Sequence, residues 1–117
     1  MPKTEKKRIL VTSALPYANG PLHIGHAIGA YIPADVYTRY HRLKGNDVIY
    51  ICGTDEHGTP IAVAAEREGV TARKVVDKYY GMIEKAFSDL GISFDNFSRT
   101  TKDPHYKMSQ DFFLRIM

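Results

Sequence analysis

Apolar residues in this sequence of 117 residues form two kinds of pattern, short continuous runs and longer stretches with a helical repeat. The runs at 8–13 and 47–52 are short, rich in aliphatic residues and apolar on both faces. This is typical of strands in a parallel sheet that helices cover on both sides. Residues 92–101 alternate more weakly, which predicts a short strand or an extended loop.

A long amphipathic helix is predicted from the end of the loop at 14–22 to about Lys44, because apolar residues recur there every three or four positions. Its apolar stripe consists of Ile24, Ile28, Ile32, Val36, Tyr40 and Leu43. Pro33 lies within the stripe and lacks a backbone donor, so we expect a kinked helix rather than two separate ones. Gly45 and Asn46 provide the C-cap chemistry that ends it.

Three further helices are predicted downstream. The first spans 60–68 and ends at Gly69, and the second spans 72–90 with Thr71 as its N-cap. The last begins at about Pro104 and continues to the final residue, with an apolar face made of Met108, Phe112 and Ile116. That face requires a covering partner, so we expect self-association or an exposed apolar surface.

The order of strand, long helix and strand is a βαβ unit, which places the protein in the α/β class with a parallel sheet and flanking helices. Ligands of such sheets bind beyond the carboxyl ends of the strands. Two loops that are distant in sequence follow the two strands, at 12–26 and 53–60. We therefore expect them to meet at one crevice.

The first loop carries His23 and His26 where the long helix begins. A helix N-terminus has amide groups without intrahelical partners and a partial positive charge, so it favours anions such as phosphate. Gly25 lies between the two imidazoles and lets a ligand approach the backbone. The alternatives are two ordinary surface histidines or half of a metal site, and a short H-x-G-H also fits small nucleotidyltransferases.

The second loop reads G-T-D-E-H-G-T-P at 53–60 and is dense in polar residues. Asp55 or Glu56 could pair with a substrate ammonium group. A simpler interpretation is a capping turn, with Thr59 as N-cap and Pro60 at the first helical position. Both interpretations are compatible, since a capping loop can also face the crevice.

Composition limits the class of protein. The length corresponds to one domain at most, and 44% apolar residues are enough for a core. No apolar run is long enough to span a membrane, and the charged start lacks the apolar segment of a signal peptide. Residues 1–7 are predicted to be a flexible basic N-terminus. The single cysteine, Cys52, indicates a reducing compartment and a buried apolar role.

The residues P-Y-A-N-G-P-L-H-I-G-H at 16–26, directly after a strand, resemble the signature loop of class I aminoacyl-tRNA synthetases. Two more stretches narrow the resemblance to the methionyl-tRNA synthetase family. They read A-D-V-Y-T-R-Y-H-R-L-K-G at 34–45 and C-G-T-D-E-H-G-T-P-I at 52–61. The resemblance implies that residues 8–117 are the first half of a Rossmann-like catalytic domain.

The same resemblance implies an activity and a set of ligands. The family activates methionine with ATP to methionyl-adenylate and transfers the methionyl group to tRNA(Met), assisted by Mg2+, in the cytoplasm. The catalytic residues carried over to this sequence are His23 and His26. Those implied to bind methionine are Ala14, Leu15, Tyr17 and Asp55. Those implied to bind ATP are Pro16, Tyr17, Asn19, Gly20, His23, Gly25 and His26.

The sequence also departs from the family pattern. The family has a second half of the nucleotide fold with K-M-S-K-S, a zinc-bearing insertion and an anticodon-binding domain, none of which is found in these 117 residues. We therefore expect a fragment, truncated at its C-terminus, that is inactive alone and binds no zinc. The alternatives are a small H-x-G-H nucleotidyltransferase and a non-catalytic binding module that retains the fold.

Overall fold

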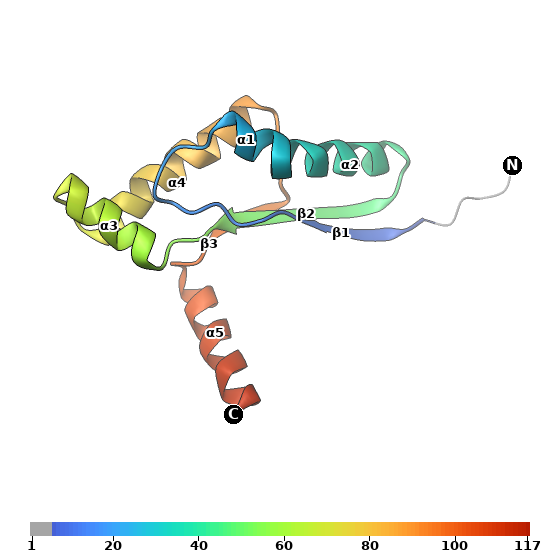
Figure 1. The fold of residues 1–117 in the computed structure, drawn as a ribbon. Coiled ribbons are helices and arrows are strands. Elements are labelled where there is room, and N and C mark those ends of the chain that lie inside the picture. The colour runs from blue at the N-terminus through green and yellow to red at the C-terminus, as the bar shows by residue number, and fades with distance from the viewer. Residues whose placement is uncertain (1–5) are drawn as a thin grey trace, which may run out of the picture.

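The computed structural model describes residues 6–117. The basic segment predicted at 1–7 is therefore mostly outside the described residues, which include only its last two positions. The chain forms a small parallel sheet with helices on one side, together with a final helix that projects away from the sheet (Figure 1).

The sheet has three strands, β1 (Arg8–Thr12), β2 (Asp47–Thr54) and β3 (Asn96–Arg99), in the order β1-β2-β3. Both pairs are parallel. All three carboxyl ends therefore lie at the same edge of the sheet. The α/β class and the parallel sheet are confirmed, and the weakly alternating segment at 92–101 does contain a strand.

Within residues 6–117, five helices and one π-helical turn connect and follow the strands. They are α1 (Ile24–His26), η1 (Ala27–Tyr31), α2 (Ile32–Leu43), α3 (Thr59–Glu68), α4 (Ala72–Asp89) and α5 (Asp103–Ile116). The first three form one continuous helical run, so the predicted long helix is confirmed. The expected disturbance near Pro33 takes the form of the π-helical turn directly before it, where Ile32 donates to the carbonyl oxygen of Ala27.

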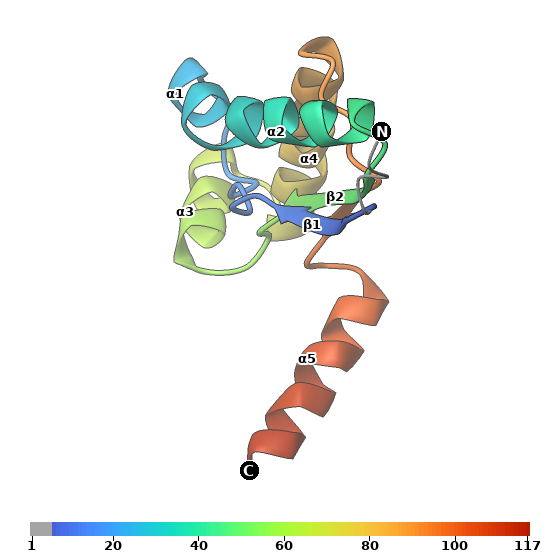
Figure 2. The ribbon, with the colours of Figure 1, turned by 90° about the vertical axis from the view of Figure 1, so that its right-hand side faces the viewer.

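The main core lies between the sheet and the layer formed by α2 and α4 (Figure 2). Strand side chains alternate between faces, so every second residue of β1 and β2 points into this core. The buried members are Val11, Tyr31, Val48, Tyr50, Cys52, Ile83, Phe87 and Ile92. Burial of Cys52 is thus confirmed. Two of these residues, Ile83 and Phe87, belong to α4.

The opposite face of the sheet is open within the described residues, which corrects one expectation. Leu10 is 65% exposed and Ile49 is 51% exposed, although both belong to apolar runs expected to be buried on two sides. Helices of residues 6–117 cover only one face of the sheet. Buried and exposed side chains therefore alternate along β1 and most of β2, as in a sheet with a single covering layer.

The predicted apolar stripe of the long helix is also placed differently. Its members Ile24, Ile28, Val36, Tyr40 and Leu43 are all exposed. The residues that face the core are instead mostly small, and the buried ones are Ala27, Tyr31, Asp35 and Thr38. Three of these four side chains are small, and the fourth, Tyr31, packs into the main core. The large residues form a second apolar face that points outwards.

Two predicted helix ends can be checked directly. Thr71 is the N-cap of α4 and accepts a hydrogen bond from the backbone N–H of Lys74 at 3.4 Å, as predicted. The cap predicted at Thr59 is wrong, because Gly58 is the N-cap of α3 and no side chain caps it. The helix thus begins one residue earlier than expected. The backbone φ of Gly58 is 109°, a value that favours glycine.

Helix α5 extends away from the sheet, and every one of its residues is exposed (Figures 1 and 2). Its large apolar side chains include Met108, Phe112, Phe113, Leu114 and Ile116. The expected exposed apolar face is therefore present. Within residues 6–117, no helix combines the length and the apolar character needed to cross a bilayer.

Gly53 provides a test of the packing between β2 and β3. A Cβ atom at this position would lie 2.7 Å from the carbonyl oxygen of Ser98, which is backbone and cannot move aside without disturbing the strand pair. We expect Gly53→Ala to lower the free energy of unfolding by about 1–3 kcal/mol, the usual cost of overpacking. Denaturant unfolding of the protein measures this.

Gly81 is the matched control, because a Cβ atom there meets nothing within 4 Å and the residue lies inside α4. Gly81→Ala should raise the free energy of unfolding by roughly 0.5–1 kcal/mol, the usual helix preference for alanine. Equal effects of the two substitutions would contradict the close approach of the strands.

Candidate functional site

The two polar loops meet at the carboxyl edge of the sheet. Tyr17 and Asp55 form an isolated parallel bridge beyond the ends of β1 and β2. The backbone N–H of Asp55 donates to the carbonyl oxygen of Pro16, and that of Ala18 donates to the carbonyl oxygen of Asp55, both at 2.9 Å. Figure 1 shows α1 above this same edge. The predicted meeting of the loops is confirmed.

His23 is the N-cap of the long helical run. Its backbone is extended, and its Nδ1 accepts a hydrogen bond from the backbone N–H of Gly25 at 3.1 Å. His26 Nδ1 accepts from the backbone N–H of His23 at 3.3 Å, so each imidazole satisfies one backbone donor at the start of the helix. The rings are stacked with their centroids 3.6 Å apart, and both residues are exposed.

These hydrogen bonds determine which ring nitrogen carries the proton. An Nδ1 that accepts a hydrogen bond is unprotonated, so a neutral ring carries its proton on Nε2. Neither Nε2 is engaged in a hydrogen bond within residues 6–117. His23 and His26 can therefore present two N–H donors to an anion at the helix start, without giving up the hydrogen bonds that position them.

The structure gives a steric explanation for glycine at position 25, in addition to the one drawn from the sequence. A Cβ atom there would lie 3.0 Å from Cε1 and 3.1 Å from Nδ1 of His23. A side chain at this position would therefore force the His23 ring to shift by a few tenths of an ångström. Gly25 thus serves the position of the imidazole as well as access to the backbone.

The predicted amino-acid side of the crevice surrounds the bridge. Asp55 is half-buried, and its Oδ1 accepts from the backbone N–H of His57 at 3.3 Å. Ala14, Leu15 and Tyr17 are exposed at the same edge, whereas Pro16 is buried. A half-buried carboxylate next to an exposed apolar side chain and an aromatic ring fits an ammonium group attached to an apolar body.

Two tyrosines that sequence reasoning did not select hold the first loop in place. The Tyr31 hydroxyl donates to the carbonyl oxygen of Ala14 at 2.9 Å, and the Tyr50 hydroxyl lies 2.8 Å from Ser13 Oγ. Burial, with a smaller contribution from Cys52, raises the pKa of Tyr31 to about 12. Burial also raises the pKa of Tyr50, against the lowering effect of its hydrogen bond to Ser13. Both hydroxyls therefore remain protonated at neutral pH.

Of the two candidate acidic residues, only Asp55 is partly exposed at this edge of the sheet. The Glu56 side chain is fully buried and forms an ion pair with Arg99 of β3. Its carboxylate is occupied inside the protein, so it does not receive a ligand. The pairing between Glu56 and Arg99 has no local sequence signal, because the helices α3 and α4 lie between the two residues in the chain.

The described residues offer no metal cage. Residues 6–117 contain no group of three His, Cys, Asp or Glu side chains that could hold a metal ion. His23 and His26 thus lack a third protein ligand within this range, and their stacked rings use Nδ1 to cap the helix. The metal-site alternative receives no support from this geometry.

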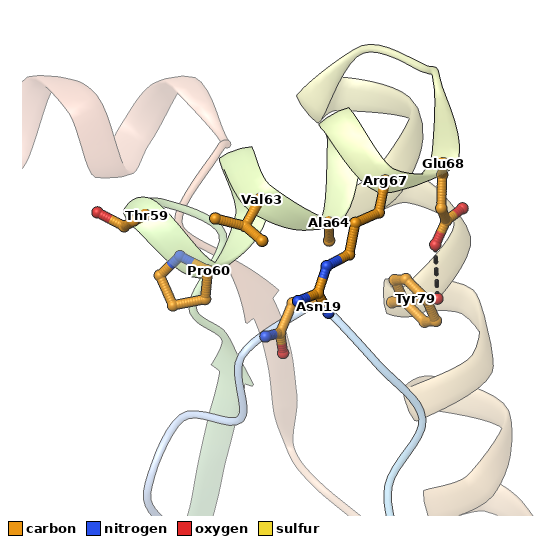
Figure 3. A pocket seen from close by; sticks show the side chains of 8 residues that line it. All are labelled: Asn19, Thr59, Pro60, Val63, Ala64, Arg67, Glu68 and Tyr79. Carbon is orange, nitrogen blue, oxygen red and sulfur yellow. Dashed lines mark hydrogen bonds between the residues drawn. The ribbon is translucent and has the colours of Figure 1, made fainter.

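A hollow of about 620 Å³ lies between the first loop and the helices α3 and α4 (Figure 3). Of the predicted site residues, only Asn19 borders it. The other lining residues belong to α3 and α4, and among them Tyr79 donates to Glu68 at 2.7 Å. The structure thus brings Pro16, Tyr17 and Asp55 together, while Asn19 turns towards a separate surface.

Comparisons with known proteins agree on one family. The family described as tRNA synthetases class I (M) matches residues 9–117. The methionine–tRNA ligase of Parabacteroides distasonis is 58% identical over 107 residues, 92% of this chain and 16% of that protein. That of Rubrobacter xylanophilus is 56% identical over 110 residues, 94% of this chain and 19% of that protein.

Solved structures give the same result. Mycobacterium tuberculosis methionyl-tRNA synthetase in complex with methionyl-adenylate superposes with a TM-score of 0.89 at 38% identity. The match covers 93% of this chain and 21% of that one. A second structure of the same enzyme bound by methionyl-adenylate gives a TM-score of 0.86 at 35% identity. The chain thus spans only about a fifth of these structures and 16–19% of the two curated relatives.

Proposed function

This chain belongs to the class I (M) family of tRNA synthetases, and we propose that it forms the first half of the catalytic domain of a methionine–tRNA ligase. The complete ligase activates methionine with ATP and transfers the methionyl group to tRNA(Met). The observation that carries this proposal is the bridge between Tyr17 and Asp55. It joins the loop with the paired imidazoles to the loop with the half-buried carboxylate.

The proposed activation step needs alignment rather than a covalent enzyme intermediate. A carboxylate oxygen of methionine attacks the α-phosphorus of ATP, a new P–O bond forms, and the bond to pyrophosphate breaks. Negative charge on the phosphoryl oxygens is stabilised by fixed donors in such a reaction. The Nε2–H groups of His23 and His26, beside the helix N-terminus, are suited to this role.

We propose the roles of the other loop residues from the resemblance to the family. Asp55 receives the methionine ammonium group, and Ala14, Leu15 and Tyr17 contact the rest of the amino acid. We also propose that Pro16, Asn19, Gly20 and Gly25 contact ATP, as the family resemblance implies. Transfer then proceeds by attack of a 3′-terminal tRNA hydroxyl on the methionyl carbonyl, and AMP leaves.

We propose that Mg2+ binds together with ATP, through the phosphates of the nucleotide. Mg2+ is usually held by substrate phosphates, water and one or two carboxylates rather than by a protein cage. The lack of a three-ligand cluster within residues 6–117 fits that mode. When bound, the ion neutralises phosphate charge, and the residues described here orient the nucleotide.

The alternative of a small H-x-G-H nucleotidyltransferase accounts for His23 and His26 only. It does not account for the family match over residues 9–117. Since the chain spans 16–19% of the two relatives compared above, we expect these 117 residues alone to be inactive. We propose a cytoplasmic location, which the free thiol of Cys52 fits.

His23 is tested by two substitutions in the complete ligase. His23→Asn keeps a side-chain acceptor at the N-cap, whereas His23→Ala removes it, so only the alanine variant should lose about 1 kcal/mol of stability. Both remove the Nε2–H donor. We expect both to lower the rate of methionine-dependent ATP–pyrophosphate exchange by about 10²-fold or more, with little change in methionine affinity. Equal losses of rate and of methionine affinity would refute this role.

Asp55 is tested by Asp55→Asn, which keeps the size of the side chain and removes its charge. Loss of a charge-assisted hydrogen bond should weaken methionine binding about 10- to 100-fold, while ATP binding is unchanged. Calorimetry of the complete ligase with each ligand measures both. The control is Asp111→Asn, on the exposed helix α5, which should alter neither. Unchanged methionine affinity in Asp55→Asn would overturn the assignment.

Self-association of the 117-residue chain is proposed from the apolar surface of α5, where Phe112 and Ile116 are exposed. Sedimentation should show concentration-dependent oligomers, and Phe112→Gln should reduce them. Gln110→Asn, at a polar position of the same helix, is the control and should leave the oligomers unchanged. A strictly monomeric chain that binds no dye for apolar surfaces would contradict this proposal.

A further inference from the structure

The feature that the proposed mechanism leaves unused is the buried carboxylate of Glu56, directly after Asp55. Its side chain is 0% exposed, and removing a carboxylate from water is costly unless it is paired and hydrogen-bonded. Its oxygens accept from Arg99 Nε at 2.8 and 3.0 Å and from Thr54 Oγ1 at 2.8 Å. The hydroxyl of Thr101 also donates to it.

Arg99 extends this arrangement to the helical layer. Its side chain is 13% exposed and its Nη2 donates to Asp77 of α4 at 2.6 Å. Its guanidinium carbon lies 4.5 Å from the centre of the Tyr80 ring. Burial lowers the pKa of Arg99, but the hydrogen bonds to Glu56 and Asp77 outweigh this and raise it overall. The partner of Glu56 is therefore a fixed cation.

Backbone hydrogen bonds also attach the segment around Glu56 to the residue that follows β3. Its N–H donates to Thr100 Oγ1 at 2.9 Å, and the N–H of Thr100 donates to the carbonyl oxygen of Thr54 at 3.2 Å. The backbone of Asp55, one residue earlier, is bonded on its other side to the loop at 16–18. Asp55 thus lies between two anchors, the loop at 16–18 on one side and Thr100, directly after β3, on the other.

Extended chain geometry links the two acidic side chains. Successive side chains of an extended segment point to opposite sides. Because Glu56 is fixed towards β3 and the interior, Asp55 is directed to the other side, where Tyr17 and the exposed loop lie. Loss of the internal anchor would free this segment to rotate and would remove the buried partner of Arg99, which would keep its pairing with Asp77.

We propose that Glu56 is a positioning residue that sets the direction of the Asp55 carboxylate through its pairing with Arg99. This inference rests on the proposed function, since it assumes that Asp55 receives the methionine ammonium group. Glu56 itself touches no substrate. Its loss should therefore act on methionine recognition and leave ATP recognition intact.

The test uses Glu56→Gln in the complete ligase, assayed by ATP–pyrophosphate exchange and by calorimetry. We expect the KM and the dissociation constant for methionine to rise about tenfold, the scale of a lost charge-assisted hydrogen bond, and the KM for ATP to change less than about twofold. Thr101→Ala removes one donor to the carboxylate and should give a smaller shift, roughly two- to fivefold, in the same direction.

Asp35→Asn is the matched control, because Asp35 is also a buried carboxylate paired with an arginine, Arg39, and belongs to α2. It should lower the unfolding temperature without changing the KM for methionine. Equal shifts in the KM values for methionine and ATP, or the same methionine shift in Asp35→Asn, would overturn the positioning role. If Glu56→Gln does not fold, the KM for methionine of the Thr101→Ala variant tests the proposal. An unchanged KM in that variant rejects it.

The two proposals fail in different ways. A wild-type ligase without methionine-dependent exchange would contradict the proposed function itself. An active wild type in which Glu56→Gln and Thr101→Ala bind methionine normally would leave the function intact and reject only the role of Glu56.

Discussion

The site depends on a short parallel contact beyond the ends of the strands, in which Asp55 exchanges two backbone hydrogen bonds of 2.9 Å with Pro16 and Ala18. The contact continues the pairing of β1 with β2 past the edge of the sheet. It brings a turn-rich loop and a polar loop into one surface at the position where parallel sheets bind their ligands. Without it, the half-buried carboxylate and the helix start would belong to separate regions.

The imidazoles at the helix start show how backbone needs can determine side-chain chemistry. Each Nδ1 accepts from a backbone N–H that the helix leaves free, so a neutral ring carries its proton on Nε2. The same hydrogen bonds therefore cap the helix and direct two donors outwards. Under the proposed function, the family signature H-I-G-H at 23–26 combines both tasks, with Gly25 leaving space for the His23 ring.

The sequence predicted the parts of the fold that follow local rules. The βαβ unit, the Thr71 cap and the approach of the two loops all came from run length, spacing and turn chemistry. Spacing did not reveal which face of the long helix is buried, because the large aliphatic residues repeat on the exposed face. The buried face carries Tyr31 among small and polar residues. Nor did spacing reveal the burial of Glu56, since its partner Arg99 belongs to a strand that pairs only in the folded protein.

The central claim is that one crevice binds the nucleotide at the paired imidazoles and the amino acid at Asp55. A crystal structure of the complete ligase with a non-hydrolysable analogue of methionyl-adenylate tests it most directly. The account predicts the ligand ammonium within roughly 3 Å of an Asp55 carboxylate oxygen, and the phosphate mimic beside His23 and His26. An analogue seated in the hollow lined by Asn19 and Arg67, with its ammonium away from Asp55, would contradict the account.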